Sequence, residues 1–211
     1  MNIIAYETRS NHKISTISKN LIIMCGWPGC GKSTLAHRLF KGIERSTIIS
    51  RDHLRDFISD SGFIEPTRDA KIVETDIHLY VCAERLLQEV NTLILDGTFH
   101  SFKKRNRVYF FARQNRCEAV IIHCVCSREA ALRRLRRQIE AREKVFNYSP
   151  EQVIAYYEKK FDQPIPEAIW ANVITVDTQD DFKPTIVDKR LKFSSPFVQS
   201  VIDVLELPIL L

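Results

Sequence analysis

Residues 26–34 combine the side chains and the spacing that phosphate binding requires. The segment reads Gly-Trp-Pro-Gly-Cys-Gly-Lys-Ser-Thr and contains the pattern G-x-x-x-x-G-K-[ST] between an apolar run and a helical pattern. Glycines let backbone N–H groups approach phosphate oxygens without interference from a Cβ atom, and the positive end of the following helix adds to the attraction. We expect Lys32 to reach the β- and γ-phosphates and the Ser33 hydroxyl to ligate Mg²⁺. The predicted nucleotide-binding residues in this loop are Gly26, Gly29, Cys30, Gly31, Lys32, Ser33 and Thr34.

A carboxylate follows a second apolar run, at Asp96 after residues 93–95. An acid at the end of a buried strand lies where proteins with such a loop hold Mg²⁺, so Asp96 is a predicted metal ligand. Gly97 follows it, whereas motor-type ATPases generally carry there an acid that orients the attacking water. The guanine-reading tetrad Asn-Lys-x-Asp is also absent from the sequence. These two absences argue against hydrolysis as the main activity and against a GTPase switch. For Asp96 itself, the alternative to a metal ligand is a turn-forming Asp-Gly pair after the strand.

A third group of polar residues, at positions 50–55, follows a short strand pattern and reads Ser-Arg-Asp-His-Leu-Arg. Asp52 is expected to face the γ-phosphate from across the same crevice, where a carboxylate accepts the proton of an attacking hydroxyl. Arg55 lies one helical turn later and is expected to bind an anionic group on the acceptor. The alternative for Asp52 is a helix N-cap.

An arginine-rich helix is predicted from residue 128 to residue 143. Its apolar stripe consists of Leu132, Leu135 and Ile139. At about 100° per residue, Arg133, Arg134 and Arg137 fall on the opposite side of the helix. Over the site these guanidinium groups would form a lid that stabilises charge on the transferring phosphoryl group. On the back of the domain they would only be solvated.

Charge is distributed unevenly along the 211 residues. The chain holds 31 Lys and Arg against 26 Asp and Glu, a net charge of +5. Residues 101–150 alone hold 13 basic and 4 acidic residues, so one basic block of +9 lies in an otherwise slightly acidic chain. Such a block suits phosphate-bearing partners, or it is a solvated helix face. The composition, 45% hydrophobic and 27% charged, excludes a wholly disordered chain, a coiled coil and a collagen-like fibre.

The elements that must position these residues alternate along the chain. Strands are predicted at residues 21–25, 47–50, 92–95, 119–125 and 172–176. Helices are predicted at 32–41, 53–59, 68–90, 102–115, 128–143 and 198–205, and the helix at 68–90 is expected to bury Val73, Ile77, Tyr80, Ala83, Leu87 and Val90. This alternation predicts an α/β P-loop NTPase fold with about five parallel strands, helices on both faces and an Arg-rich lid helix. Ligands should then bind at the carboxyl ends of the strands.

The predicted boundaries give one domain with two extensions. Residues 1–17 form an N-terminal extension, residues 18–178 the kinase domain with its lid at about 127–148, and residues 179–211 a C-terminal extension with a terminal helix. The first 20 residues lack the apolar segment of a secretory signal, so we expect a cytoplasmic protein with reduced thiols. Cys30 is expected to be a small filler in the loop, and the alternative is an oxidisable thiol. Neither the oligomeric state nor the adenine contacts follow from the sequence.

Together, residues 26–34, 50–55 and 95–98 and the Arg-rich helix resemble the P-loop kinase family of polynucleotide 5′-hydroxyl kinases and related zeta-toxin-like kinases. The resemblance spans roughly residues 20–178. It implies that Asp52 is the general base for a 5′-hydroxyl, that Arg55 holds the acceptor's 3′-phosphate and that Asp96 contacts the acceptor side. It also implies that lid arginines, best matched by Arg134 and Arg137 with Arg133 beside them, clasp the phosphates of ATP. Asp-Gly-Thr-Phe at residues 96–99 also resembles the Asp-Ala-Thr-Phe of small-molecule kinases in the same family.

Three functions fit these residues. The first is an ATP- and Mg²⁺-dependent kinase for the 5′-hydroxyl of DNA or RNA. The second is a kinase for a small hydroxylated metabolite, nucleotide sugar or antibiotic, which predicts little salt-dependent binding of oligonucleotides. The third is a nucleotide-binding regulatory protein with little turnover.

Overall fold

A six-stranded sheet forms the centre of the protein. A computed structural model describes residues 19–60, 68–141, 148–169, 171–180 and 183–207. The strands lie in the order β2-β3-β1-β4-β5-β6, and the first five of them are parallel. The sixth pairs antiparallel with β5. Their bounds are β1 Lys19–Cys25, β2 Ser46–Ser50, β3 Thr92–Asp96, β4 Cys117–Val125, β5 Asn172–Asp177 and β6 Thr185–Arg190.

The central strands are buried on both faces, which is why they read as continuous apolar runs. In β1, Ile22 pairs with Ile94 of β3 on one side and with Val120 of β4 on the other. All three side chains are fully buried. This register brings the carboxyl ends of β1, β3 and β4 to the same edge of the sheet.

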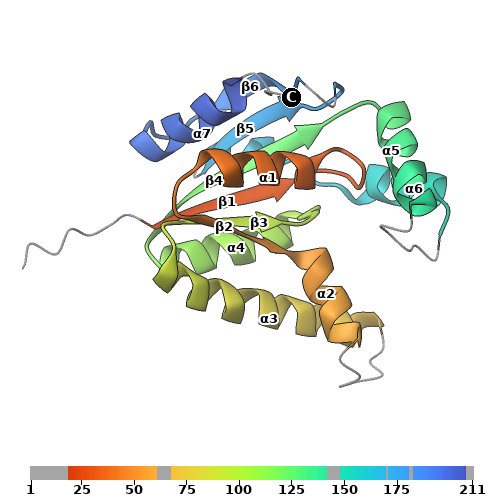
Figure 1. The fold of residues 1–211 in the computed structure, drawn as a ribbon, viewed down its shortest axis with the longest axis horizontal. Coiled ribbons are helices and arrows are strands. Elements are labelled where there is room, and N and C mark those ends of the chain that lie inside the picture. The colour runs from red at the N-terminus through yellow and green to blue at the C-terminus, as the bar shows by residue number, and fades with distance from the viewer. Residues whose placement is uncertain (1–18, 61–67, 142–147, 170, 181–182, 208–211) are drawn as a thin grey trace, which may run out of the picture.

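Helices cover both faces of the sheet and its carboxyl edge (Figure 1). α1 and α7 pack on one face, where their apolar residues share a core with β1, β4 and β5. α3 and α4 pack on the other face. α2 leaves the end of β2, and α5 and α6 lie together at the edge toward which β1 and β4 point. The bounds are α1 Lys32–Gly42, α2 Arg51–Asp60, α3 Arg68–Glu89, α4 Phe102–Gln114, α5 Arg128–Glu140, α6 Pro150–Lys160, η1 Ile165–Ile169 and α7 Pro196–Glu206.

The predicted fold class is confirmed, and the structure adds elements that the sequence did not indicate. β6 is an edge strand whose residues are mostly exposed, so it lacks an apolar run. α6 begins with Pro150 at its first position and is capped by Ser149 together with Gln152. The proline read as punctuation in the sequence, whereas at this position it starts a helix. The predicted extensions at residues 1–17, the lid residues 142–147 and the last four residues of the chain lie outside the described residues.

The buried face of α3 differs from the predicted one. Val73 and Ile77 were expected in the core, yet each is 57% exposed. The predicted Ala83 and Leu87 are buried, and in the first half of the helix Thr75 and Leu79 take the buried positions instead of Val73 and Ile77. The chain is apolar on both stripes, and the packing of α3 against β2 and β3 selects the second. Within the described residues, no helix is long and apolar enough to cross a membrane.

Candidate active site

The predicted phosphate-binding loop joins the end of β1 to α1. Gly29 and Gly31 adopt φ angles of 79° and 78°, in the left-handed region that only glycine enters without strain. A Cβ atom on Gly29 would lie 2.5 Å from the carbonyl oxygen of Ala131 in α5, and one on Gly26 would lie 2.5 Å from that of Cys124 in β4. The glycines therefore permit both the turn of the loop and its close contact with two neighbouring elements.

Lys32 lies at the base of this loop with its side chain buried. Its Nζ donates a hydrogen bond of 2.6 Å to the carbonyl oxygen of Trp27. Burial alone would lower the pKa of this ammonium, but Cys30, Asp96, Cys124 and Asp52 raise it above its ordinary value. Lys32 thus remains charged and faces the acids that end β3 and begin α2.

Two oxygen-bearing residues beside Lys32 fit a hard divalent cation. Ser33 is exposed on the first turn of α1, and Asp96 is a buried carboxylate at the end of β3. Asp96 also pairs in register with Ser50, the last residue of β2. A hydroxyl and a carboxylate are ligands that Mg²⁺ accepts along with phosphate oxygens and water. This donor set fits the predicted metal position, and Thr34 lies exposed next to it.

Cys30 is buried beneath the loop. Its sulfur lies 3.8 Å from the Nζ of Lys32. Burial alone would raise its pKa, but a hydrogen bond with the Cys124 thiol and the charge of Lys32 lower the pKa to about 6. The side chain fills space under the glycines, as the sequence predicted for a small residue.

Asp52 and Arg55 lie on one face of α2, at the start of the helix. Arg55 Nη1 and Asp52 Oδ1 are 3.1 Å apart, and Arg55 Nη2 also contacts Asp56 at 3.3 Å. The helix begins at Arg51, and the backbone N–H of His53 donates to the Ser50 hydroxyl at 3.3 Å. Ser50 therefore takes the capping role that was the alternative for Asp52, and the Asp52 carboxylate lies within the first turn.

The Arg-rich helix α5 packs directly against the phosphate-binding loop. Ala131 and Leu135 are fully buried, and a Cβ on Gly29 would touch both residues. Arg134 does not point away from this face as the periodicity suggested. Its guanidinium donates to the carbonyl oxygens of Gly29, at 3.3 Å, and of Thr178. Arg133 and Arg137 are exposed on α5, so the structure brings Arg134 alone of these three into contact with the loop.

Thr178 was not anticipated as part of the site. It follows β5, and its hydroxyl donates to the carbonyl oxygen of Cys30 at 2.8 Å and contacts that of Val125 at 3.0 Å. The residue ties the phosphate-binding loop to the ends of β4 and β5. A threonine after an apolar strand carries no sequence signal for such a contact, because the partner is 148 residues away.

A buried ion pair, also absent from the predictions, shapes the segment after β3. Arg105 of α4 is fully buried, and its Nη2 lies 2.6 Å from Glu167 Oε1 in η1. Nη1 of Arg105 donates to the carbonyl oxygen of Phe99 at 2.7 Å, and the Tyr109 hydroxyl donates to Glu167 at 2.5 Å. Phe99 has a φ angle of 39°, which is strained for a residue with a side chain. The pair therefore fixes the backbone that carries Thr98 and His100.

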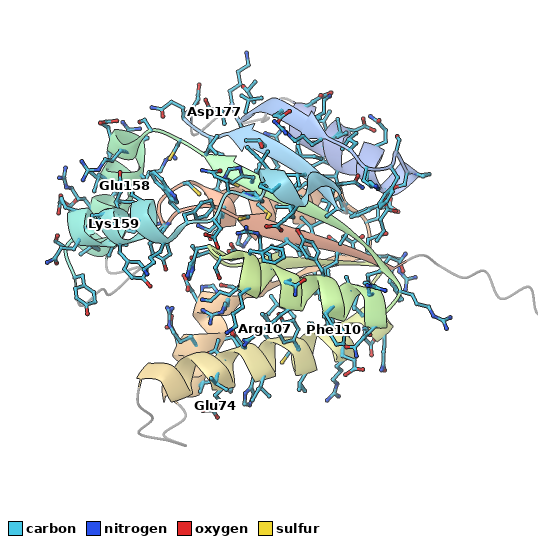
Figure 2. All side chains as sticks on the ribbon, turned by 180° about the vertical axis from the view of Figure 1, so that it is seen from behind. Glu74, Arg107, Phe110, Glu158, Lys159 and Asp177 are labelled. Atoms are coloured by element: carbon cyan, nitrogen blue, oxygen red, sulfur yellow. The ribbon has the colours of Figure 1, made fainter. Side chains whose placement is uncertain are left out.

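A pocket opens next to Asp52, between α3, α4 and the segment after β3. The residues that line it are Arg51, Asp76, Tyr80, Thr98, Phe99, His100, Lys104, Arg107 and Tyr157. Figure 2 shows Arg107 on α4, on the side that faces α3. Tyr157 comes from α6, so the pocket draws residues from four elements and the strand end. Of the predicted site residues, the structure gathers Lys32, Asp52, Asp96 and Arg134 around the carboxyl ends of β1, β2 and β3.

Comparisons with known proteins agree with this fold. A family model described as an AAA domain matches residues 21–164. A candidate kinase from Chloroflexus aurantiacus J-10-fl is 22% identical with a TM-score of 0.65, over 78% of this chain and 90% of that one. Kti12 from Chaetomium thermophilum, solved with ADP-AlF3, is 22% identical with a TM-score of 0.60, over 76% and 90%. A gluconokinase from Sinorhizobium meliloti 1021 is 15% identical with a TM-score of 0.51, over 88% and 89%.

The structural similarities are low in sequence identity and show the fold alone. The family match covers more than half of the chain and includes most of β1, the phosphate-binding loop and the elements from α1 to α6. The chain belongs to the AAA domain family, in which it forms a P-loop kinase-like domain.

Proposed function

We propose that the protein is an ATP-dependent phosphotransferase that moves the γ-phosphoryl group to an acceptor hydroxyl, and that the acceptor is the 5′-hydroxyl of DNA or RNA. The observation that carries the proposal is the convergence of Lys32, Asp96 and Asp52 from β1, β3 and β2. The acids are close enough to Lys32 to raise its pKa, so the phosphate-binding cation faces both of them.

Each residue of this group has a separate role. The loop glycines and Lys32 hold the β- and γ-phosphates of ATP, with Arg134 above them on α5. Ser33 and Asp96 would hold Mg²⁺, which supplies neutralising charge on the phosphate oxygens. Asp52 accepts the proton of the acceptor hydroxyl as its oxygen attacks the γ-phosphorus and the bond to ADP breaks.

The position of the basic block supports a nucleic-acid acceptor. α4 belongs to residues 101–150, and it contributes Lys104 and Arg107 to the pocket next to Asp52. The block thus borders the place where the acceptor hydroxyl must lie. It also contacts the phosphate-binding loop, through the side chain of Arg134. A small hydroxylated metabolite is the alternative acceptor, and the gluconokinase fold does not decide between them.

Label transfer from γ-labelled ATP to a 5′-hydroxyl oligonucleotide in Mg²⁺ tests the proposal. Lys32→Ala and Asp52→Asn should each reduce transfer by about 10²-fold or more, the usual contribution of a phosphate-binding charge or a general base. Asp56→Asn is the matched control, because Asp56 lies on the same helix and also contacts Arg55. Transfer that survives Asp52→Asn would remove the base assignment. Absence of transfer to any nucleic acid would favour a small acceptor or a regulatory nucleotide-binding role.

A further inference from the structure

The pocket beside Asp52 carries more positive charge than it neutralises. Asp76 is its carboxylate, and it contacts Arg51 at 2.8 Å through Oδ1 and Arg107 at 3.4 Å through Oδ2. Lys104 adds a third cation to the lining. Three cations against one carboxylate leave an excess of two positive charges in a half-enclosed space, where an anion is strongly favoured.

Lys104 is the cation whose charge is least compensated. Its side chain is partly buried, and among the residues that the structure describes its ammonium group makes no ion pair or hydrogen bond, whereas its backbone N–H donates to the carbonyl oxygen of Ser101 at 3.0 Å. Burial and the neighbouring charges of Arg51 and Arg107 lower its pKa, against the opposing effect of Asp76. An ammonium held in this way gains most from a ligand that brings negative charge.

Flat, uncharged rings line the same pocket. His100 and Tyr157 meet edge to face with their centroids 5.3 Å apart, and Tyr80 lies on the α3 side. Burial and the charges of Lys104 and Arg51 lower the pKa of His100 to about 4, so its ring is neutral at pH 7. Rings of this kind bind nucleobases by stacking, without strong preference for one base.

The pocket lies next to the reacting groups. Arg51 precedes Asp52 in the chain, and the charges of Asp52 and Lys32 both act on the Tyr157 hydroxyl. Arg55, to which the family resemblance assigns the acceptor phosphate, contacts Asp52 and Asp56 instead of lining this pocket. A phosphate held by α4 would therefore leave a neighbouring hydroxyl within reach of Asp52.

We propose that Arg51, Lys104 and Arg107 form the acceptor's phosphate subsite, and that the acceptor is a nucleoside carrying a phosphate beyond the hydroxyl to be modified. The inference rests on the proposed function and names the part of the substrate that the pocket recognises. The phosphate comes either from a nucleoside 3′-monophosphate or from the first linkage of an oligonucleotide, and the two share the same chemistry.

The test combines binding with turnover in the full chain. Equilibrium binding of adenosine 3′-monophosphate, adenosine, inorganic phosphate and a 5′-hydroxyl oligonucleotide is measured by calorimetry with ADP and Mg²⁺ present, and KM and kcat are measured for the nucleosides and the oligonucleotide. Lys104→Met should raise the Kd and KM of both phosphorylated acceptors roughly 10- to 100-fold, the effect of losing one charge-assisted contact. It should leave adenosine unchanged. Lys103→Met, an exposed neighbour on the same helix, should change each value less than about twofold.

Each outcome separates the inference from the proposed function. Lys104→Met should fold with an unchanged or higher melting temperature, since it removes a charge that its neighbours repel. Equal affinity for adenosine and its 3′-monophosphate, or a Lys104→Met effect no larger than that of Lys103→Met, would overturn the subsite even if transfer occurs. Phosphate-dependent binding that requires Lys104, without turnover, would sustain the subsite and reject the proposed reaction. A preference for the oligonucleotide over the mononucleotide identifies the source of the phosphate.

Discussion

Two arginine–carboxylate pairs lie on either side of α4, and they differ in every property that decides what an ion pair does. Arg105–Glu167 is fully buried, and both partners have further hydrogen bonds, to Phe99 and Tyr109. Arg51–Asp76 is about 15% exposed and shares its carboxylate with Arg107. The first pair is buried, and its charges are neutralised and hydrogen-bonded. The second pair lines a pocket that has an excess of positive charge.

Under the proposed function, α4 contributes to stability on one side and to acceptor recognition on the other. A buried charge must be neutralised within the protein, so the Arg105 guanidinium serves only to hold the backbone at Phe99 in place. The partly hydrated Arg51, Lys104 and Arg107 tolerate an excess of positive charge until a ligand arrives. We therefore expect changes at the first pair to alter stability and changes at the second to alter acceptor binding.

Glu167→Gln should produce the largest effect. It leaves the Arg105 guanidinium buried without a counter-charge, which typically costs about 3–5 kcal/mol of unfolding free energy. Urea denaturation measures the loss. Glu158→Gln is the control, because Glu158 forms a half-exposed pair with Arg128 at 3.3 Å and should cost less than about 1 kcal/mol. A loss at Glu167 as small as that at Glu158 would break the comparison.

Acidification should produce the second effect, through a histidine beside the buried pair. Burial and the charge of Arg105 lower the pKa of His123 to about 4. An unfolded histidine titrates near 6.5, so the unfolded chain binds more protons between pH 6.5 and 4, and stability falls as the pH drops through this window. The expected loss is roughly 1–2 kcal/mol at pH 5. It should shrink in His123→Phe, whose ring can keep the stacking with Phe161, but persist in His78→Phe at an exposed site. An unchanged slope in His123→Phe would contradict the assignment.

Asp76→Asn should cost less unfolding free energy than Glu167→Gln, because the Asp76 side chain keeps about 15% exposure and that of its partner Arg107 about 53%. The pocket gains one positive charge, so the KM of a phosphorylated acceptor should fall about threefold at low salt, and less at high salt. Steady-state kinetics at two ionic strengths check this. A raised KM would mean that Asp76 acts mainly by holding Arg51 in place.

The parallel sheet and the nucleotide half of the site could be predicted because their signals are local. Apolar runs identified β1 and β3, and the residue after each run is carried to one edge by parallel pairing. Lys32, Asp52 and Asp96 therefore converge by topology alone. The loop pattern also specifies its own chemistry, which is why its glycines and Lys32 are where the sequence placed them.

The acceptor half depends on packing that no local pattern encodes. Tyr157 could not be placed in the pocket because α6 was not predicted, since Pro150 was interpreted as a break. Asp76 could not be placed there because α3 carries two apolar stripes, and the sequence does not indicate which of them is buried. On the nucleotide side, the family resemblance named Arg134 as a lid residue, whereas the leucine periodicity alone put it opposite the apolar stripe. Its long side chain reaches the loop from the edge of the helix.

The contact between Thr178 and Cys30 has a consequence for synthesis of the chain. The phosphate-binding loop leaves the ribosome before its anchors in α5 and after β5, which are translated more than a hundred residues later. At about 5–20 residues per second, several seconds pass before those anchors can dock. A nascent chain should therefore acquire nucleotide affinity late and in a single step, once β5 has paired with β4.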